Sequence, residues 1–281
     1  MTTIETRRHP AGVKDPSALM LGLHRGVIEL KTFFRERDSV VFTFALPIVL
    51  LALLGSLFDA VYAGTTVTAA QYLVPSMIAA GVASTSFVNL GISIAADRDD
   101  GTLKRLRGAP MPKSAYFLGK VVMVLVISLA EVVLIVGLGV ALFDVTLPRA
   151  PERWATFGWV FVLGVVACSF LGIAASSLAR TARGAAAVMN LPYLVLAFLS
   201  GIFYTPISAL PPGLAQIGAL FPLKWMAQGF RSVFLPDSIL PQEIVSTSWE
   251  HGRTALVLAA WCAGGLLLCL MTFRWRGRRE Q

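Results

Sequence analysis

Residues 97–112 read DRDDGTLKRLRGAPMP and form a block of charge between two long apolar runs. The runs on either side, 72–96 and 116–143, are both longer than the roughly 20 residues that a helix needs to cross a bilayer. Charged side chains are costly inside lipid, so the block must lie at a membrane surface between two spans. Its mixture of acids, bases and spaced leucines favours a docking surface over a plain loop.

The two apolar runs belong to a larger set that decides the fold class. The chain has 281 residues, 56% hydrophobic and 14% charged, whereas soluble domains carry about 25% charge. Backbone groups in lipid must bond within their own segment, so each run of spanning length is expected to be a helix. The sequence therefore predicts an all-α polytopic membrane protein with six transmembrane helices, over residues 40–58, 72–96, 116–143, 154–178, 185–203 and 255–273. Pro47 and Pro192 are expected to kink the first and the fifth.

The placement of the basic residues predicts the orientation of the spans. The formal net charge of +8 does not indicate a nucleic-acid partner, because the bases flank apolar runs and form no continuous basic face. Most of them lie in the N-terminal segment, in the loops after the second and fourth spans, and in the C-terminal tail. These segments share one side of the membrane. The positive-inside rule then predicts that both termini are cytoplasmic.

The N-terminal segment, 1–39, is expected to contain an amphipathic helix along the cytoplasmic membrane interface. Its apolar residues recur at three- and four-residue steps, which places them on one helix face: Leu19, Leu23, Val27, Leu30 and Phe34. A simple membrane anchor and a contact with a partner protein both fit this pattern.

The segment between the fifth and sixth spans, 204–253, is rich in proline. Two stretches within it, 213–223 and 225–235, are mostly apolar yet too short to cross a bilayer. We therefore expect an outer re-entrant pair that dips into the membrane and returns. No internal repeat is visible, which argues against secondary transporters built from repeated halves.

Sequence signatures of enzymes are missing from the chain. His9, His24 and His251 are the only histidines, no Ser-His-Asp set or metal motif accompanies them, and none lies in a predicted span. The stretch GAPMPKS at 108–114 resembles a phosphate-binding loop, but Pro112 stands where a glycine should precede the lysine, and no strand leads into it. The sequence predicts no ATPase or other catalytic activity, no metal and no cofactor on this chain.

A few polar residues inside the spans are candidates for a substrate path. Glu131 lies near the middle of the third span, where a charge costs about 2.5–3.5 kcal/mol on insertion scales. It either faces a translocation path or is a carboxyl that fixes helix packing. Asn89 and Ser93 in the second span, and Asn190 and Tyr193 in the fifth, either line the same path or hydrogen-bond neighbouring helices. Lys120 lies within a turn of a span end and is expected to extend to the surface.

The charged block itself is expected to contain a short helix over 102–107. Acids precede it, bases end it, and Thr102 is placed to cap it, as the helix dipole favours. Leu103 and Leu106 fall on one side. Because a helix this short is unstable alone, it must pack against other cytoplasmic segments or against a separate protein.

Two motifs in the right order resemble those of the type-2 ABC transporter permease family, which includes drug-resistance and polysaccharide or lipid exporters. The first is acid-Arg-acid-x-Gly-Thr-Leu-x-x-Leu-x-x-x-Pro over 97–110, followed by Gly119-Lys120. The second begins with Leu199-Ser200-Gly201-Ile202-Phe203 and continues through Pro206, Leu210-Pro211, Phe221-Pro222-Leu223 and Gly229-Phe230-Arg231. The likeness covers nearly the whole chain, and the daunorubicin-resistance-like branch is most similar. The chain departs from the family in having Asp at acidic positions where Glu is frequent, and Ala109 before the proline.

The resemblance implies a function and assigns residues to it. It implies that one set carries motion from an ATPase subunit: Asp97, Arg98, Asp99, Asp100, Gly101, Thr102, Leu103, Arg105, Leu106 and Pro110. It also implies that the proline-rich segment borders an outer gate, at Phe203, Pro206, Pro211 and Pro222. The expected protein is a permease subunit in the bacterial plasma membrane, moving a hydrophobic or amphipathic drug, lipid or glycoconjugate out of the cytoplasm or inner leaflet.

The same resemblance implies partners. We expect two copies of an ABC ATPase that holds ATP and Mg, a second permease as homodimer or heterodimer, membrane lipids and no nucleic acid. In domain terms, a cytoplasmic segment 1–39 precedes a permease domain 40–273, with a coupling loop at 97–115 and the re-entrant segment at 204–253, and a basic tail 274–281 follows. The alternative is an ATP-independent ion-coupled carrier or channel, which would need more intramembrane charge than Glu131 alone.

Overall fold

The computed structural model describes residues 17–57, 61–62, 65–108, 112–179, 181–203, 210–243 and 248–272. Within these ranges the chain is helical, apart from an isolated bridge between Val61 and Thr68 and short connections. The predicted basic tail 274–281 and residues 1–16 of the predicted N-terminal segment 1–39 lie outside the described residues.

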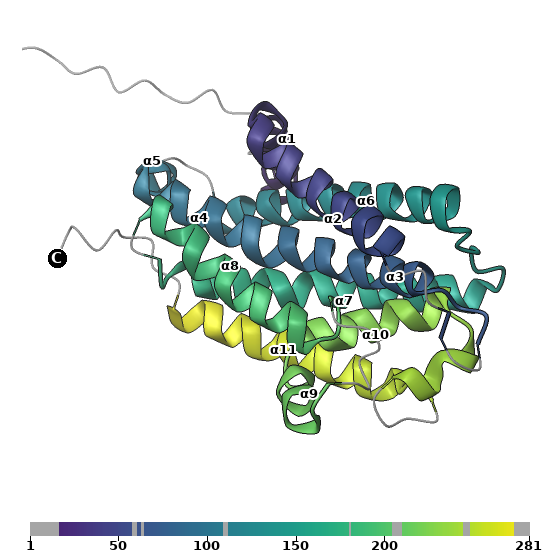
Figure 1. Ribbon diagram of the computed structural model, residues 1–281. Helices are drawn as coiled ribbons and strands as arrows, with labels where there is room; N and C mark the ends of the chain where they lie inside the picture. Colours follow the sequence, from purple (N-terminus) through teal and green to yellow (C-terminus); the bar gives the residue numbers. More distant parts are fainter. Residues whose placement is uncertain are drawn as a thin grey trace, which may run out of the picture.

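Six helical segments within the described ranges are long and apolar enough to cross a membrane, which confirms the predicted number. They lie side by side as a bundle (Figure 1). In chain order they are α2 (Arg37–Leu57), α3 (Ala69–Ala83) continuing through η1 (Ser84–Asn89) into α4 (Leu90–Asp99), α6 (Lys113–Phe143), α7 (Pro151–Ser176), α8 (Ala182–Leu199) and α11 (His251–Thr272).

Two details of the spans differ from the sequence prediction. The fifth predicted span, 185–203, runs past the end of α8, because the chain turns at Gly201, whose φ of +66° favours glycine. The second span contains a π-helical turn, η1, which the apolar pattern did not predict. The close approach of α7 accompanies this turn: a Cβ on Gly172 would lie 2.6 Å from the Phe87 carbonyl oxygen. Such turns mark irregular points in a span.

Shorter helices connect or cover the spans. They are α1 (Ala18–Arg35), α5 (Thr102–Gly108), α9 (Pro212–Ala219), α10 (Pro222–Phe234) and η3 (Asp237–Gln242). Pro212 and Pro222 occupy the first turns of α9 and α10, where the missing N–H costs nothing. The two predicted short apolar stretches are therefore both helical, with shifted ends.

Helix α10 lies in the interior of the molecule. Every residue from Pro222 to Phe234 is buried, and the helix packs against α3, α7 and α11. Small residues permit this packing: a Cβ on Gly164 of α7 would lie 2.8 Å from Met226, and one on Gly229 of α10 would lie 2.8 Å from Val160. The α3–η1–α4 span is the other central element, with most of its residues buried.

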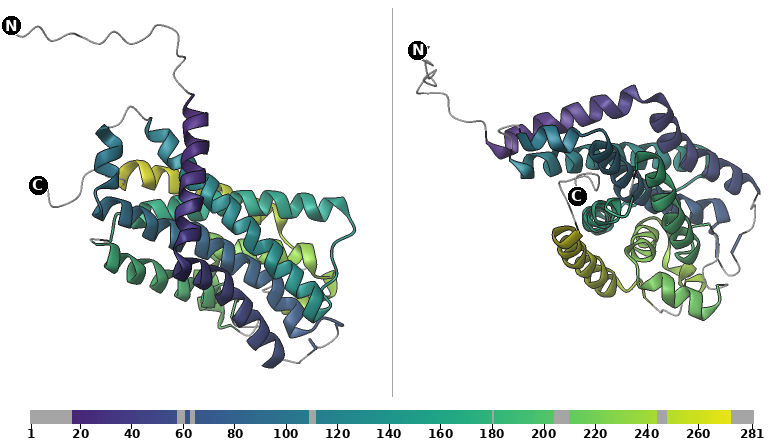
Figure 2. Two further views of the ribbon diagram at one scale, coloured as in Figure 1. Left: turned by 90° about the horizontal axis from the view of Figure 1, so that it is seen from above. Right: turned by 90° about the vertical axis from the view of Figure 1, so that its left-hand side faces the viewer.

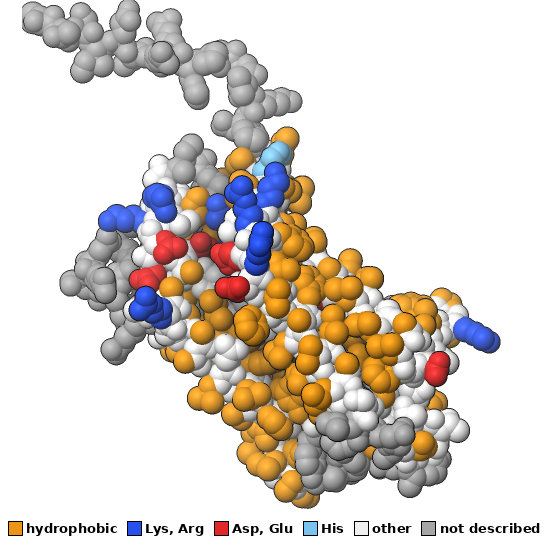
Figure 3. All heavy atoms as spheres, turned by 45° about the horizontal axis from the view of Figure 1, so that its top comes forward, with side chains coloured by type: hydrophobic (Ala, Val, Ile, Leu, Met, Phe, Trp, Pro, Cys, Tyr) orange, Lys and Arg blue, Asp and Glu red, His pale blue; other side chains and the backbone are white. Residues whose placement is uncertain are grey.

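The surface separates apolar flanks from a charged end. Figure 3 shows Lys, Arg, Asp and Glu gathered over α1, α4 and α5, and hydrophobic side chains along the side of the bundle. Large apolar residues such as Phe42 on α2, Leu191 on α8 and Met271 on α11 are exposed there. A belt of this kind around six spanning helices identifies a multi-pass membrane protein. We call the charged end the α5 end.

Candidate functional site

The predicted coupling residues lie in the last turn of α4, where three consecutive side chains each reach a different helix. Asp97 Oδ2 accepts a hydrogen bond from the Tyr116 hydroxyl of α6 at 2.8 Å. Arg98 donates to the carbonyl and hydroxyl oxygens of Ser176 in α7, at 3.0 and 3.1 Å. Asp99 Oδ2 accepts from the backbone N–H of Ala182, in the first turn of α8, at 3.0 Å. The end of α4 is thereby joined to three spans.

Helix α5 follows α4 directly and packs against its own chain. After Asp100, Gly101 adopts a φ of +73°, a conformation that lets the chain turn from α4 into α5. Leu103 is 1% exposed and so faces this chain, whereas Lys104 and Arg105 are exposed. Leu106 is half-buried and Thr102 accepts a hydrogen bond from Arg105.

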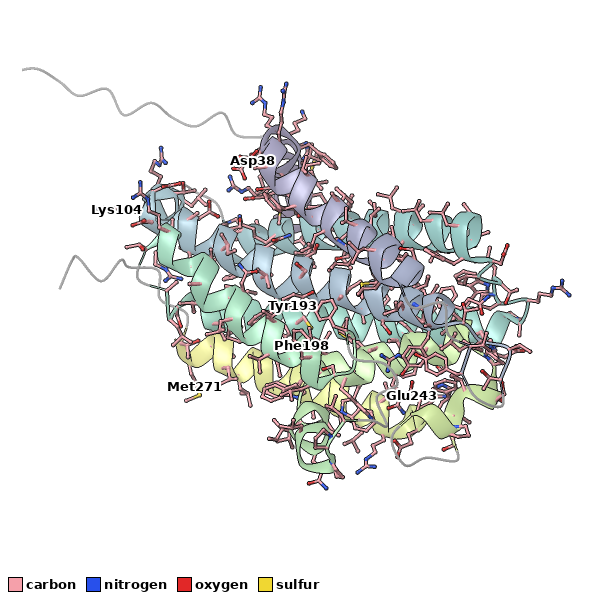
Figure 4. The ribbon with its side chains drawn as sticks, in the orientation of Figure 1. Asp38, Lys104, Tyr193, Phe198, Glu243 and Met271 are labelled. Atoms are coloured by element: carbon pink, nitrogen blue, oxygen red, sulfur yellow. The ribbon has the colours of Figure 1, made fainter. Side chains whose placement is uncertain are left out.

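Leu103 therefore packs against this chain, which is one of the two partners expected for the short helix. The face of α5 that remains available to another protein is therefore polar. Figure 4 shows Lys104 at the tip of the bundle. Pro110, the last residue of the predicted coupling set, lies outside the described residues.

A buried ion cluster stands behind the end of α4. The Lys120 ammonium of α6 lies 2.8 Å from Glu29 Oε2 of α1 and 2.8 Å from Asp97 Oδ2, and it also bonds the Ser93 hydroxyl. Lys120 is 1% exposed and Glu29 is buried, so the expectation that Lys120 extends to the surface is wrong. Ser93, predicted for the substrate path, accepts a hydrogen bond from Lys120 in this cluster at the α5 end.

Helix α1 crosses the bundle transversely near that end (Figure 2). It meets α6 through glycine: a Cβ on Gly26 would lie 2.8 Å from Val122, and one on Gly119 would lie 3.1 Å from the Gly26 nitrogen. The buried face of α1 is thus Gly22, Gly26, Glu29 and Phe33. Most of the apolar stripe found in the sequence faces away from the protein, with Leu19, Leu23, Val27 and Phe34 about half exposed or more. Its fifth member, Leu30, packs against the core.

The glycine spacing was the available signal for the ion cluster. Gly22 and Gly26, four residues apart, mark a helix face that permits close approach, and Glu29 falls on that same face. The leucine stripe on the other face of the helix was used to interpret this segment, and Glu29 was not predicted as a buried residue. Nothing in the sequence pairs Glu29 with Lys120, since that pairing depends on where α1 crosses α6.

A cavity of about 500 Å³ lies between α2 and α8, over the α3–η1 segment. Of the residues predicted for the path and gate, Asn190, Tyr193 and Phe203 line it. Figure 4 labels Tyr193, together with Phe198 of the same helix. The rest of the lining is mostly apolar: Phe42, Thr43, Leu46, Pro47, Leu50, Leu54, Met77, Ala80, Ser84, Leu194 and Phe198.

The polar atoms of this cavity are tied to the surrounding helices. Tyr193 donates to the Ala80 carbonyl oxygen at 3.0 Å, and Asn190 donates to the Ala186 carbonyl oxygen at 2.8 Å. Asn89 does not line the cavity but donates to Thr43, which does, at 3.0 Å. Among the described residues, the lining carries no charged side chain.

Glu131 is not among the residues that line the cavity. It is 2% exposed, and its Oε2 accepts from the Thr85 hydroxyl of η1 at 2.7 Å. Its Oε1 has no hydrogen-bond partner among the described residues and lies where a Cβ on Gly81 would be 3.3 Å away. The structure thus places this carboxyl between α6 and the π-helical turn.

The end of the bundle away from α5 holds a second buried ionic cluster, which sequence reasoning missed. Arg231 of α10 is 1% exposed and contacts Glu243, Ser76 and the Gly201 carbonyl oxygen. In the sequence it is one of three basic residues in the proline-rich segment, with Lys224 and Arg253, and only the burial of α10 reveals its position. Figure 4 shows Glu243 far from Lys104.

Lys224, about two turns before Arg231 in α10, is also buried. Its ammonium lies 3.7 Å from the centre of the Trp225 ring and bonds the Gln228 side chain. Burial lowers the pKa of Lys224 to about 8, partly offset by the charges of Glu243 and Glu250.

Of the remaining gate residues, Pro211 and Pro222 do not line the cavity. Pro211 precedes α9, Pro222 begins α10 in the buried interior, and Pro206 lies outside the described residues. Within the described part of the chain, no group of three His, Cys, Asp or Glu side chains could hold a metal ion.

The sequence matches a known family over most of this architecture. Residues 27–235 match the family described as ABC-2 type transporter, a stretch that runs from α1 through α10. The chain belongs to this family. It is the permease of an ABC-2 type transporter, a non-catalytic membrane subunit of the kind that pairs with ATP-binding subunits.

Curated relatives of this ABC-2 permease agree with the assignment. It is 25% identical to a Bacillus subtilis protein named "Putative transport permease YvfS", over 73% of this chain and 82% of the relative. It is 26% identical to the inner membrane transport permease YadH of Escherichia coli, over 61% of this chain and 65% of YadH. A third relative of Escherichia coli, named "Probable multidrug ABC transporter permease YbhR", is 24% identical over 67% of this chain and 49% of its own length.

Proposed function

We propose that this ABC-2 permease is the membrane subunit of an exporter, driven by a separate ATPase and moving a hydrophobic or amphipathic substrate out of the cytoplasm or the inner leaflet. The observation that carries the proposal is the joining of Asp97, Arg98 and Asp99 to α6, α7 and α8. A movement of the α5 end is therefore transmitted to several spans at once. An ion-coupled carrier or channel does not require a surface through which a separate subunit moves its spans.

The α5 end is the cytoplasmic end in this proposal. Exposed basic residues there include Lys31, Arg35, Lys104 and Arg105, as the positive-inside rule requires of the cytoplasmic side. Helix α1 then lies in the interface with its leucine stripe in lipid and its glycine face on α6. The plasma membrane of a bacterium is the proposed location, as for the inner membrane relative YadH.

The opposite end is the outer end, and α9 and α10 form the re-entrant segment. Both helices are too short to cross a bilayer, and α10 is buried against α3, α7 and α11. A helix that enters the bundle interior from one side and leads back to that side fits this description.

The partner ATPase docks on the polar face of α5 and the adjoining turn. Asp99, Asp100, Lys104 and Arg105 are exposed there. ATP, with Mg, binds on the ATPase, and closure of an ATPase dimer moves α5. The end of α4 moves with it and draws on α6, α7, α8 and, through Lys120, on α1.

The cavity between α2 and α8 is the proposed substrate site. Its volume of about 500 Å³ falls within the range of roughly 300–1,000 Å³ typical of small-molecule pockets. Its lining is apolar with a few hydroxyl and amide groups, which suits a neutral or amphipathic molecule. Among the spans, α2 and α8 are the least buried, so a second permease, identical or homologous, would cover this side.

The test is reconstitution of the permease with its partner ABC ATPase in proteoliposomes. ATP hydrolysis and substrate movement are measured together. Arg98→Ala and Asp99→Ala should leave the complex assembled and lower transport about tenfold, which corresponds to ~1.4 kcal/mol of lost coupling. Arg149→Ala, an exposed residue between α6 and α7, is the matched control and should change little.

A double charge reversal tests docking itself. Lys104→Glu with Arg105→Glu should reduce the amount of ATPase that copurifies, because both side chains are exposed on α5. Transport by the permease without any ATPase, or equal transport by the Arg98 and Arg149 variants, would refute the proposal.

A further inference from the structure

The outer cluster around Arg231 joins four separate parts of the chain. The guanidinium comes from α10, and its Nε and Nη2 donate to the Ser76 hydroxyl of α3 at 3.1 and 2.9 Å. Nη1 lies 3.3 Å from Glu243 Oε1, just after η3. Nη2 also donates to the backbone carbonyl oxygen of Gly201, just after α8.

The cluster is closed and internally compensated. The guanidinium stacks 4.4 Å from the centre of the Tyr72 ring, and the Tyr72 hydroxyl donates to Glu243 Oε1 at 2.7 Å. Arg231, Tyr72 and Glu243 are all at most 4% exposed. Each polar atom of a buried charge pair needs a hydrogen-bond partner from the protein, since water does not reach it. The positions of these partners are therefore tightly constrained.

The bond to Gly201 differs from the others because it holds backbone rather than a side chain. Helix α8 ends at Leu199, and the chain reverses through Gly201 with its positive φ. Phe203, two residues later, lines the cavity. A donor fixed in α10 therefore sets the direction in which the chain leaves α8, and with it the place of Phe203.

We propose that Arg231 is a positioning residue for the outer mouth of the cavity: it holds the turn after α8 so that Phe203 closes one side of the substrate site. This inference rests on the proposed transport function. It assigns to Arg231 a role that the predicted gate residues do not include. Tyr72, Ser76 and Glu243 orient the guanidinium, and α10 supplies the rigid support.

Arginine is needed for this task because of its shape. The planar fork reaches Ser76, Glu243 and Gly201 in different directions at once. A lysine at 231 would keep the charge beside Glu243 but could not span all of these acceptors. Arg231→Lys therefore separates charge from positioning.

The test measures the accessibility of position 203 directly. Phe203→Cys is placed in a full-length background in which Cys168, Cys262 and Cys269 are alanine, and the rate of maleimide labelling is measured in membranes that contain the permease and its ATPase. Adding Arg231→Lys should raise that rate about tenfold, because hydrogen bonds to a charged group would no longer hold the turn. Arg253→Gln, which removes an exposed ion pair with Glu250, is the control and should not change it.

A second readout separates positioning from simple loss of structure. In proteoliposomes, Arg231→Lys and Phe203→Ala should shift the KM for transport in the same direction, and the double variant should show no further shift, since both act through one contact. Membrane insertion of each variant should be unchanged. Ser76→Ala, which removes an acceptor and keeps every charge, should produce a smaller shift of the same sign.

Two outcomes overturn the inference. The first is an unchanged labelling rate at position 203 in both Arg231→Lys and Ser76→Ala. The second is full additivity of the Arg231 and Phe203 effects on KM. If labelling changes as expected while no ATP-dependent transport is found even without substitutions, the proposed function fails and the positioning role stands.

Discussion

Replacing Lys120 by methionine tests the buried ion cluster at the α5 end. Methionine has a similar length and no charge, so the substitution removes the ammonium while filling most of its space. Glu29 and Asp97, both 2.8 Å from that ammonium, lose their shared partner. Their side chains are only 7% and 18% exposed, so water cannot readily replace it.

The size of the effect follows from these distances. At 2.8 Å and an effective dielectric constant of about 20, each contact is worth about 6 kcal/mol before desolvation is counted. Because the ammonium was itself costly to bury, the net loss is smaller, and removing one partner of a buried pair typically costs about 3–5 kcal/mol. We expect Lys120→Met to lower the free energy of unfolding by about that amount.

The measurement is denaturant unfolding in detergent micelles, followed by tryptophan fluorescence. Lys120→Arg should keep most of the stability. Lys120→Met combined with Glu29→Leu should recover part of the loss, because it removes a buried carboxylate that would otherwise keep only its ion pair with Arg25. Arg253→Gln breaks a pair whose arginine is 67% exposed and should cost less than about 1 kcal/mol. Equal losses for Lys120→Met and Arg253→Gln would refute the reasoning.

Three further predictions concern the middle and the outer end of the bundle. Gly172→Ala should destabilise the protein by about 1–3 kcal/mol, since its Cβ would meet the Phe87 carbonyl at 2.6 Å; Gly158→Ala, with nothing within 4 Å, should be neutral or stabilising in the same unfolding assay. Leu46→Trp should fill part of the cavity and lower the affinity for large substrates more than for small ones, measured by equilibrium binding. Equal substrate affinities of the Leu46→Trp variant and the unchanged protein would show that the cavity is not part of the substrate path. Burial lowers the pKa of Lys224 from 10.5 to about 8, so between these values the unfolded chain binds a proton that the folded protein has released. The stability of the protein relative to Lys224→Met should therefore rise as pH increases from 8 towards 10. Thermal unfolding measures this difference. A flat difference across that range would show that Lys224 is solvated.

The spans were predictable because lipid imposes a one-dimensional rule. Apolar runs of spanning length must be helices, and six such runs became six helices. The rule says nothing about irregular turns within a run, so η1 and the early end of α8 at Leu199 were not foreseen. Both depend on close contacts with other helices, as at Gly172, or on a single backbone conformation, as at Gly201.

The candidate site was predictable in part, and there is a physical reason why some of its residues were predicted and others were not. Asn190 and Tyr193 were chosen as polar residues near Pro192, and Phe203 as a gate residue that the family resemblance implies. The structure brings all three to one cavity. The ionic partners of Lys120 and Arg231 were not found, because each pair joins segments far apart in the chain. Leu103 fitted a docking contact in the sequence equally well, and only its burial shows that it faces its own chain.

The α3–η1–α4 span connects the two ionic clusters. Asp97 and Ser93 join it to the Lys120 cluster at the α5 end, and Tyr72 and Ser76 join it to Arg231 at the other. Buried ion pairs are seldom more stabilising than apolar packing, but each tolerates few alternative arrangements. The two ends of the span are therefore held firmly, while η1 lies between them with a geometry that departs from the regular α-helix. We expect relative movement of the two ends to be absorbed at η1, beside Glu131 and the cavity, which is why Gly172→Ala should impair transport as well as stability.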